Sequence, residues 1–365
     1  MKIIALFNNK GGVGKSTLAF HVGCALNELG FKTLLVDLDP QCNLTINGID
    51  EESLHKIWKE EDRYIDDFEG GLLLDNFTNI INLPRSIHFL LKPVEDGVSD
   101  FKELPPLIEL DTNLDLLPGR LSIHKYENKL AERWSGAYQG DNLSIRTITN
   151  IRNICRRYSE ANDYDYIIID TSPSLGILNK TIISTVDGFM VPAQPDMFSL
   201  YGIRNIGNAL ELWSKEFNII YSLISTEKRK KFPEKYVQFI GYNIYNAKPY
   251  SGLNEYDLSQ AHYDYVKKIP DTIKKYIKKI NRTNISDELI SKPIGDNSIM
   301  HTHNTYPSMS QKYKCPIWKV PDIAPDVEED PRLISSISGN RKSYYDTKEK
   351  YFIFSKALIE RINTL

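Results

Sequence analysis

Short apolar runs alternate with helix-like segments along the first half of the chain. Residues 3–7 have the pattern of a short buried strand, and residues 15–29 have the apolar spacing of a helix that Gly30 would end. Two further apolar runs, within residues 32–43 and 164–174, include aspartates at their ends. Strands separated by helices are typical of parallel βαβ units. We therefore expect an α/β fold with a doubly wound, mostly parallel sheet flanked by helices on both faces.

The composition is that of an ordinary globular protein and argues against several classes. The chain has 365 residues, of which 41% are hydrophobic and 25% are charged. It contains no run of about 18 apolar residues, the length that a membrane-spanning helix needs, and its first apolar stretch is too short for a signal peptide. The four cysteines are far apart, which argues against a disulfide framework or a CxxC metal site. This pattern fits a reducing cytosol, so we expect a cytoplasmic protein.

The sequence NNKGGVGKST, residues 8–17, lies between the first predicted strand and the first predicted helix. In that position free backbone N–H groups and the helix dipole bind oligophosphate, and glycines let the backbone wrap the phosphates. Lys15 would reach the β- and γ-phosphates, and the Ser16 hydroxyl would ligate Mg²⁺. The standard pattern has a glycine where this chain has Asn9. The predicted nucleotide-binding residues are Gly11, Gly12, Val13, Gly14, Lys15, Ser16 and Thr17.

Acidic residues end two of the predicted strands, at the sheet edge where parallel sheets bind ligands. Asp170 follows the run III and is the natural acid to hold Mg²⁺ through a water molecule. Asp37 and Asp39 lie in DLDPQ at the end of another run. Because aspartates commonly end strands and cap helices, one such acid alone would be weak evidence. We expect all three to lie near the glycine loop.

The loop KGGVGKST, with a lysine before its glycines, resembles the deviant Walker A loop of the ParA/MinD family of P-loop ATPases. DLDPQ resembles the first switch segment of that family, and residues 171–206 resemble its second switch, next helix and following strand. Within the latter segment, Lys180 stands where the family pattern has a small residue. The resemblance covers most of the chain, with its specific motifs in the first 200 residues.

This resemblance implies particular roles for the motif residues. In the family, the early lysine reaches across a dimer interface to the partner's nucleotide, and the second aspartate of the first switch orients the attacking water. Lys10, Lys15 and Asp39 are therefore the expected catalytic residues, with ATP and Mg²⁺ as cofactors. The expected metal set is Ser16, Asp39 and Asp170, supported by Asp37, and the candidate base-contacting residues are Pro195 and Asn246.

The resemblance also implies a function. It predicts an ATPase that dimerises on ATP binding, binds DNA nonspecifically and partitions or positions plasmid or chromosome cargo, with slow hydrolysis that a ParB-like partner stimulates. One alternative is a MinD-like or other assembly ATPase that acts on a protein complex or a membrane. Another is a metabolic P-loop enzyme, for which Lys10 would have no role across subunits. A nitrogenase-reductase relative is disfavoured, because no cysteine follows the strand ends where a bridging cluster would need ligands.

Two stretches are longer than the fold needs: residues 51–110, which we expect to form helices on the rim near the first switch, and residues 226–312. No Pro/Gly/Ser-rich linker sets either apart, so we predict a single domain over residues 1–365. Because the glycine loop begins at residue 8, we expect no helix-turn-helix domain before it and no operator-specific binding.

The second stretch is basic, with 13 Lys or Arg and 6 Asp or Glu between residues 226 and 282. A surface for DNA phosphates is one interpretation, and an ordinary solvated lysine face is the other. Residues 271–282 predict a helix with one apolar face, made of Ile273, Tyr276, Ile277 and Ile280. The candidate DNA-binding residues are Lys228, Arg229, Lys230, Lys231, Lys274, Lys275, Lys278 and Lys279.

The last part of the chain offers weaker signals. Residues 300–313 contain His301 and His303 without nearby acids or cysteines at ligand spacing, so we expect a polar loop near the nucleotide base or the dimer rim rather than a metal site. Residues 315–322 would precede a closing helix. That helix has mixed charge, which argues against a membrane anchor despite a potential apolar stripe, formed by Phe354, Leu358, Ile362 and Leu365.

Overall fold

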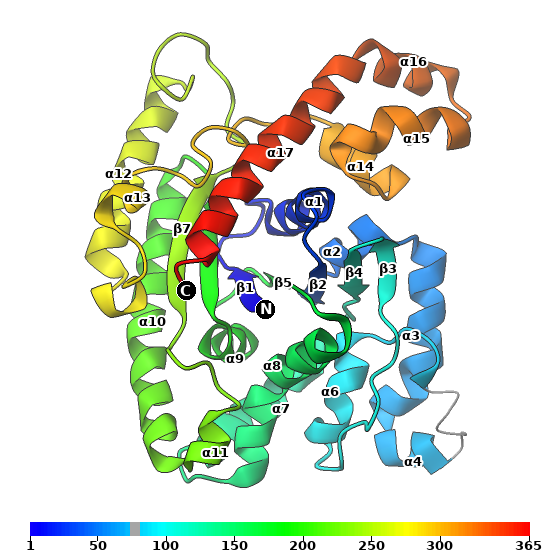
Figure 1. Ribbon diagram of the computed structural model, residues 1–365, viewed down its shortest axis with the longest axis vertical. Helices are drawn as coiled ribbons and strands as arrows, with labels where there is room; N and C mark the ends of the chain where they lie inside the picture. Colours follow the sequence, from blue (N-terminus) through cyan, green and yellow to red (C-terminus); the bar gives the residue numbers. More distant parts are fainter. Residues whose placement is uncertain (74–80) are drawn as a thin grey trace.

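The centre of the molecule is a seven-stranded sheet with the order β3–β4–β2–β5–β1–β6–β7 (Figure 1). The computed structural model describes residues 1–73 and 81–365. Neighbouring strands are parallel except for the edge pair β3–β4. The predicted doubly wound α/β fold is therefore confirmed. The strands are β1 (Lys2–Leu6), β2 (Thr33–Leu38), β3 (Ile108–Asp111), β4 (Leu114–Leu117), β5 (Tyr166–Thr171), β6 (Gly188–Ala193) and β7 (Gln238–Ile244).

Helices cover both faces of the sheet, because successive side chains of each buried strand point to opposite faces. Ile4 and Leu6 of β1 join one apolar cluster, and Ile3 and Ala5 join the other. The first face carries α1 (Lys15–Glu28), α2 (Asn43–Gly48) and α17 (Arg341–Ile362). The second face carries α6 (Ile87–Glu95), α7 (Ile123–Ala137), α8 (Asn142–Asn162), α9 (Ile177–Thr185), α10 (Met197–Leu223) and α12 (Gln260–Tyr276).

The 51–110 stretch forms helices, as predicted, within the part that the structure describes, but α6 covers the second face of the sheet and does not lie on the rim. The stretch contains α3 (Glu51–Asp66), α4 (Phe68–Leu73) and α6, and it ends in the edge strand β3, which the sequence pattern did not predict. Residues 74–80 of this stretch lie outside the described residues. The edge strand is short and polar on its outer side, so its hydrophobic pattern is weak.

The 226–312 stretch includes β7, so its additional elements lie on both sides of a sheet strand. They include α11 (Thr226–Arg229), the whole of α12, and α13 (Asp287–Ser291). The predicted continuous helix over residues 271–282 is wrong, because α12 ends at Tyr276. Ile277 then adopts an extended backbone that keeps its side chain buried, whereas Ile280 is 67% exposed. Burial of Ile277 in the core thus overrides the helical spacing.

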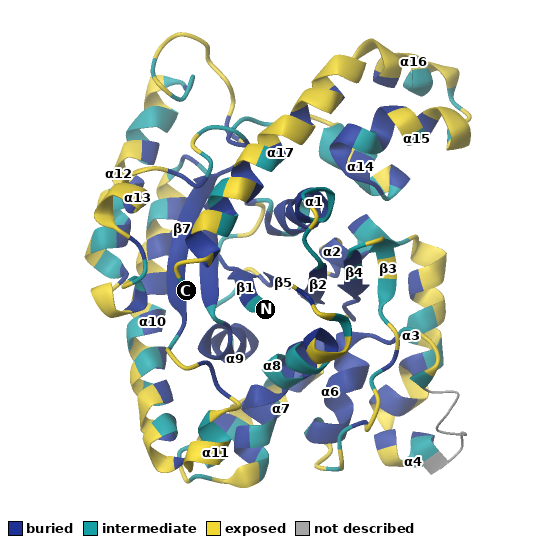
Figure 2. Ribbon diagram, viewed as in Figure 1, coloured by how far each residue is buried: buried dark blue, intermediate teal, exposed yellow. Residues whose placement is uncertain are grey.

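The chain ends in a set of helices that the sequence pattern only partly predicted. After α14 (Tyr306–Tyr313), two short helices, α15 (Val320–Val327) and α16 (Pro331–Gly339), precede α17. Figure 2 shows that much of α16 and the first half of α17 is exposed, whereas the second half of α17 packs onto the body of the molecule. The stripe residues Phe354, Leu358 and Ile362 are fully buried, which confirms a closing helix. Within the described residues, no helix has the length and apolar character needed to cross a bilayer.

Candidate nucleotide site

The glycine loop connects β1 to the N-terminus of α1, as the sequence predicted. Gly12 and Gly14 have φ angles of 74° and 79°, in the left-handed region that glycine tolerates. A Cβ atom on Gly14 would lie 2.4 Å from the ring of Tyr245, so this position has no room for a side chain. Gly14 is also the N-cap of α1. The loop conformation therefore depends on glycine for both backbone and steric reasons.

The loop lines a cavity of about 360 Å³ at the carboxyl edge of the sheet. The structure brings together all seven predicted loop residues and Asp39 in this lining. Other lining residues were not named individually. Gln41, Asn43 and Asn47 follow Asp39 closely in the chain, and Asn43 and Asn47 are one helical turn apart in α2. The remaining lining residues come from distant segments: Pro173, and three residues of the stretch 300–313 that was expected near the nucleotide base or the dimer rim, Pro307, Ser308 and Gln311.

Lys15 and Asp170 form a buried, electrostatically linked pair near the loop. Burial lowers the pKa of Lys15, and the carboxylates of Asp170 and Asp39 oppose that shift. Burial also raises the pKa of Asp170 to about 8, together with the charge of Asp37, although Ser16 and Lys15 act in the opposite direction. Both carboxyl oxygens of Asp170 are buried without a hydrogen-bond partner among the described residues. Such oxygens fit a site for a hydrated divalent cation.

Asp37 and Asp39 have different surroundings although they are two residues apart. Asp37 is fully buried beside Asp170, its register partner on the neighbouring strand. Its Oδ2 accepts hydrogen bonds from the N–H and hydroxyl of Thr45 at 2.8 and 2.7 Å, and its Oδ1 accepts one from the N–H of Asp39 at 3.1 Å. Asp39 lines the cavity, and its Oδ1 accepts the N–H of Gln41 at 2.9 Å. Asp37 thus anchors the segment that carries Asp39.

Lys10 lies outside the lining of its own chain's cavity. Its ammonium donates to Oε1 of Gln194 at 2.7 Å and forms an ion pair with Asp196. Gln194 in turn donates to the carbonyl of Gly12 at 2.9 Å. The two loop lysines therefore have separate places: Lys15 is buried at the cavity, and Lys10 is held against the start of α10.

Comparison with known proteins identifies the family. A model of the AAA_31 family, described as an AAA domain, matches residues 1–222. The sporulation initiation inhibitor protein Soj of Bacillus subtilis is 28% identical over 221 residues, which are 60% of this chain and 68% of Soj. The chromosome partitioning protein ParA of Myxococcus xanthus is 27% identical over 218 residues, which are 60% of each chain. The chain belongs to the ParA-like P-loop ATPases.

The structural comparison agrees on the fold of this ParA-like chain. The structure of pNOB8 ParA bound to nonspecific DNA matches with a TM-score of 0.52 and 19% identity, and the match covers 99% of this chain and 98% of that one. The matches to relatives by sequence are shorter: they span 47% to 68% of the length of those relatives.

Two predicted nucleotide contacts are not part of the cavity lining in this ParA-like chain. Pro195 is buried between Gln194 and Asp196, the two residues that bind Lys10. Asn246 is exposed after β7 and has a left-handed φ of 62°. Contact of either residue with a base stays a prediction. Residues 300–313 were expected as a polar loop near the nucleotide base or the dimer rim. Residues 306–313 form the helix α14 rather than a loop, and three residues of this helix line the cavity.

The candidate DNA-binding residues of this ParA-like chain fall in two places. Lys228 is bound to Asn142 at the start of α8, and Lys230 forms an ion pair with Glu227. The second group spans the last turn of α12 and the residues just after it, where Lys278 lies 3.5 Å from Glu211 of α10. Among the described residues, the exposed members that form no ion pair are Lys231, Lys275 and Lys279. The basic stretch is therefore solvent-facing in both places but partly neutralised.

Lys180 departs from the family pattern and has a structural explanation. Its ammonium lies 3.8 Å from the ring centroid of Trp134 and 2.7 Å from Glu216. Trp134 in turn donates its Nε1–H to the hydroxyl of Thr181 at 2.8 Å. Lys180 thus ties α9 to α7 and α10, away from the nucleotide cavity.

Proposed function

We propose that this chain is an ATPase that forms a dimer on binding ATP, and that the dimer binds DNA without sequence preference to move or position cargo. The observation that carries the proposal is the separation of the two loop lysines. Lys15 serves the cavity of its own chain, whereas Lys10 has its ammonium outside that cavity. A second copy is the partner whose phosphates Lys10 would reach. Family membership and the DNA complex of a ParA with the same fold support this proposal.

The surface beside Lys10 supports contact with a second copy. Met197, Phe198 and Tyr201 at the start of α10 are 48%, 65% and 54% exposed. The ammonium of Lys10 lies 6.0 Å from the ring centroid of Phe198. Clustered exposed apolar side chains commonly mark an interaction surface. A dimer formed here would bury these side chains and bring Lys10 to the partner's nucleotide in the same step.

Hydrolysis of ATP requires dispersal of negative charge on the phosphates and a water molecule held in line. Lys15 and the backbone N–H groups at the start of α1 would stabilise the phosphate charge. Ser16 and Asp170 would hold Mg²⁺, which supplies further positive charge when bound. Asp39 would orient the water through Oδ2, since its Oδ1 is already bonded to Gln41. A partner protein would accelerate this otherwise slow step.

The proposal is tested by mass and DNA retention in parallel. Sedimentation velocity should show a monomer without nucleotide and with ADP, and a dimer with a nonhydrolysable ATP analogue and Mg²⁺. Retention on nonspecific duplex DNA should require ATP and fall steeply between two salt concentrations. A monomer at saturating analogue would overturn the dimer. Equal, negligible retention in all nucleotide states would overturn the DNA function and favour an ATPase that acts on a protein complex.

A further inference from the structure

We propose that Thr45 is a positioning residue for Asp39, and that the rim helix α3 controls ATP hydrolysis through it by a relay of contacts, Trp58–Gly119–Thr45–Asp37–Asp39. The proposal rests on the ATPase function proposed above and names a regulation of that same site. It gives the 51–110 stretch a role that neither the motif analysis nor the comparisons supply.

The inner half of the relay is a continuous set of short hydrogen bonds. Thr45 is fully buried, and its hydroxyl donates to Oδ2 of Asp37 at 2.7 Å. The same hydroxyl accepts the N–H of Gly119 at 2.8 Å. Asp37 in turn holds the N–H of Asp39 at 3.1 Å. The Thr45 hydroxyl therefore acts as donor and acceptor at once. Through it, the loop after β4 is connected to Asp37 and so to the segment that carries Asp39.

The outer half of the relay joins the same loop to α3. Trp58 donates its Nε1–H to the carbonyl of Gly119 at 3.1 Å. Arg120 donates to the carbonyl of Trp58 at 2.8 Å and to Glu61 at 3.0 Å. Glu61 is fully buried and also accepts two hydrogen bonds of 2.6 Å from Ser86. Because the buried charged network of Arg120 and Glu61 is costly to break, the loop with Gly119 and Arg120 should move together with α3.

Gly119 also transmits position by contact. A Cβ atom there would lie 3.0 Å from Cγ of Asp37 and 3.1 Å from Sγ of Cys42. The loop backbone is therefore packed directly against the carboxyl group that anchors Asp39. A displacement of the loop toward the sheet must move Asp37, since close-packed interiors leave no slack.

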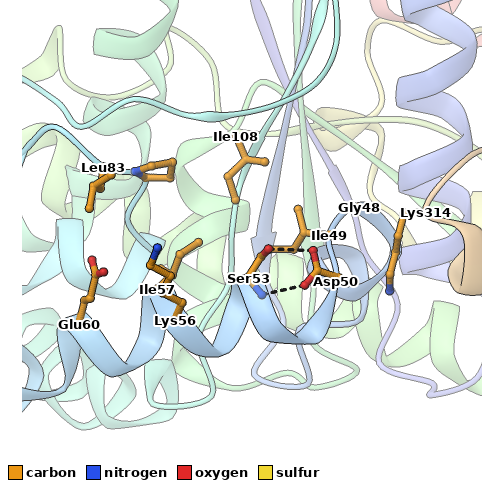
Figure 3. A pocket seen from close by; sticks show the side chains of 11 residues that line it. Gly48, Ile49, Asp50, Ser53, Lys56, Ile57, Glu60, Leu83, Ile108 and Lys314 are labelled. Atoms are coloured by element: carbon orange, nitrogen blue, oxygen red, sulfur yellow. Dashed lines mark hydrogen bonds between the residues drawn. The ribbon is translucent and has the colours of Figure 1, made fainter.

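A cavity of about 420 Å³ lies beside the junction of α2 and α3. Ile49, which follows α2, and Ser53 and Ile57 of α3 lie on one side of it, and Leu83 and Ile108 lie on the other (Figure 3). Its rim carries Lys314, which donates to the carbonyl of Ile46 at 2.6 Å. The hydrogen bonds through Gly119 therefore connect the middle of α3 to Thr45 by a route that does not pass through this cavity. A loss of about 1 Å in the placement of a catalytic group can cost roughly 10²-fold in rate.

The test is a double-mutant cycle on steady-state ATP hydrolysis. Thr45→Val keeps the side-chain shape but removes the hydroxyl, and it should lower kcat at least about tenfold while the KM for ATP changes less than about threefold. Thr45→Ser keeps the hydroxyl and should retain most of the rate. Trp58→Phe should cost a smaller factor alone and almost nothing in the Thr45→Val background, because both changes break one relay. The proposal would be overturned by a normal kcat for Thr45→Val. It would also be overturned if the double variant lost kcat by the product of the two single losses.

A matched control separates the relay from general destabilisation. Trp134→Phe removes an indole N–H bonded to Thr181 of α9, outside the relay, and it should leave kcat unchanged at equal thermal stability. Hydrogen exchange of the nucleotide-free protein provides a readout that does not need activity. Trp58→Phe should accelerate amide exchange in residues 39–46, whereas Trp134→Phe should not. If the wild-type chain does not hydrolyse ATP, the ATPase proposal fails, but the exchange result still decides whether α3 is coupled to the switch segment.

Discussion

The ammonium of Lys10 is bound to the carboxylate of Asp196 in the same chain, at the N-cap of α10. Asp196 also accepts the N–H of Ser199 at 2.9 Å. Although burial opposes the shift, the hydrogen bonds from Lys10 and Ser199 lower the pKa of Asp196, so its carboxylate stays charged and holds the lysine. Lys10 must leave this ion pair before it can serve the nucleotide of a second copy.

Lys10→Ala should therefore separate nucleotide binding from dimerisation. We expect the variant to bind ATP, because Lys15 and the loop backbone are intact, and to remain a monomer with the nonhydrolysable analogue. Fluorescent-nucleotide titration and sedimentation velocity measure the two properties on one sample. Lys59→Ala, which removes an exposed lysine of α3, is the control and should dimerise normally. Normal ATP-dependent dimerisation of Lys10→Ala would contradict the role of Lys10 across subunits.

Asp39→Ala should stop hydrolysis while ATP remains bound. The variant loses the oxygen that would orient the attacking water but leaves Lys15, Ser16 and Asp170 in place, so we expect turnover to fall by roughly 10²-fold or more. The ATP dimer should then persist, which a DNA-retention time course with ATP and Mg²⁺ would show. Lys342→Ala, an exposed change on α17 outside the cavity lining, is the control and should hydrolyse ATP at the wild-type rate. Full turnover by Asp39→Ala would contradict the assignment.

Asp170→Asn should stabilise the chain in the absence of nucleotide and Mg²⁺. The folded pKa of Asp170 is raised to about 8, so the folded state binds more protons than the unfolded state above about pH 4, and stability falls as the pH rises toward 8. Burial raises the pKa of Asp37 to about 6, which adds to the decline only in the lower part of this range. The variant should gain on the order of 1–3 kcal/mol at pH 8.

Urea unfolding at pH 5, 6.5 and 8 measures this effect. Asp163→Asn, an exposed change at the left-handed C-cap of α8, is the control and should follow the wild-type pH dependence. If the stability of Asp170→Asn depends on pH as that of the wild type does, ionisation of Asp170 is not what destabilises the folded chain at high pH. The same variant should lose the stabilisation that Mg²⁺ and ATP give to the wild type.

Removal of the lysines in the last turn of α12 and just after it should weaken DNA binding in a salt-dependent way. Replacement of Lys274, Lys275, Lys278 and Lys279 by alanine removes phosphate contacts, so both the affinity and the slope of log affinity against log salt should fall, by about 0.9 for each lost contact. Retention of the ATP-bound protein on duplex DNA at several salt concentrations gives the slope. Replacement of the exposed Lys342 and Lys350 should leave it unchanged. An unaltered slope in the first variant would assign these lysines to an ordinary solvated face.

The local sequence was sufficient to predict the glycine loop and the strands beside it. Gly12 and Gly14 are required by positive φ angles, and the apolar runs before Asp37 and Asp170 are long enough to form central parallel strands. Parallel pairing then places these two acids side by side, since strand ends share one edge of the sheet. The helix predicted over residues 271–282 was wrong because burial of Ile277 outweighed local spacing.

The sequence by itself thus determined the phosphate loop, the acidic edge and the α/β class, because each depends on neighbouring residues and on a regular repeat. Only the tertiary structure decided that Gln311 lines the cavity, that Lys10 is held by Asp196, and that Gly119 contacts Thr45. These pairs are far apart in the chain, and they meet only because the sheet order and the packing of α3, α10 and α14 bring them together. Local propensity carries no information about such long-range contacts, whereas the close packing of the folded core specifies them.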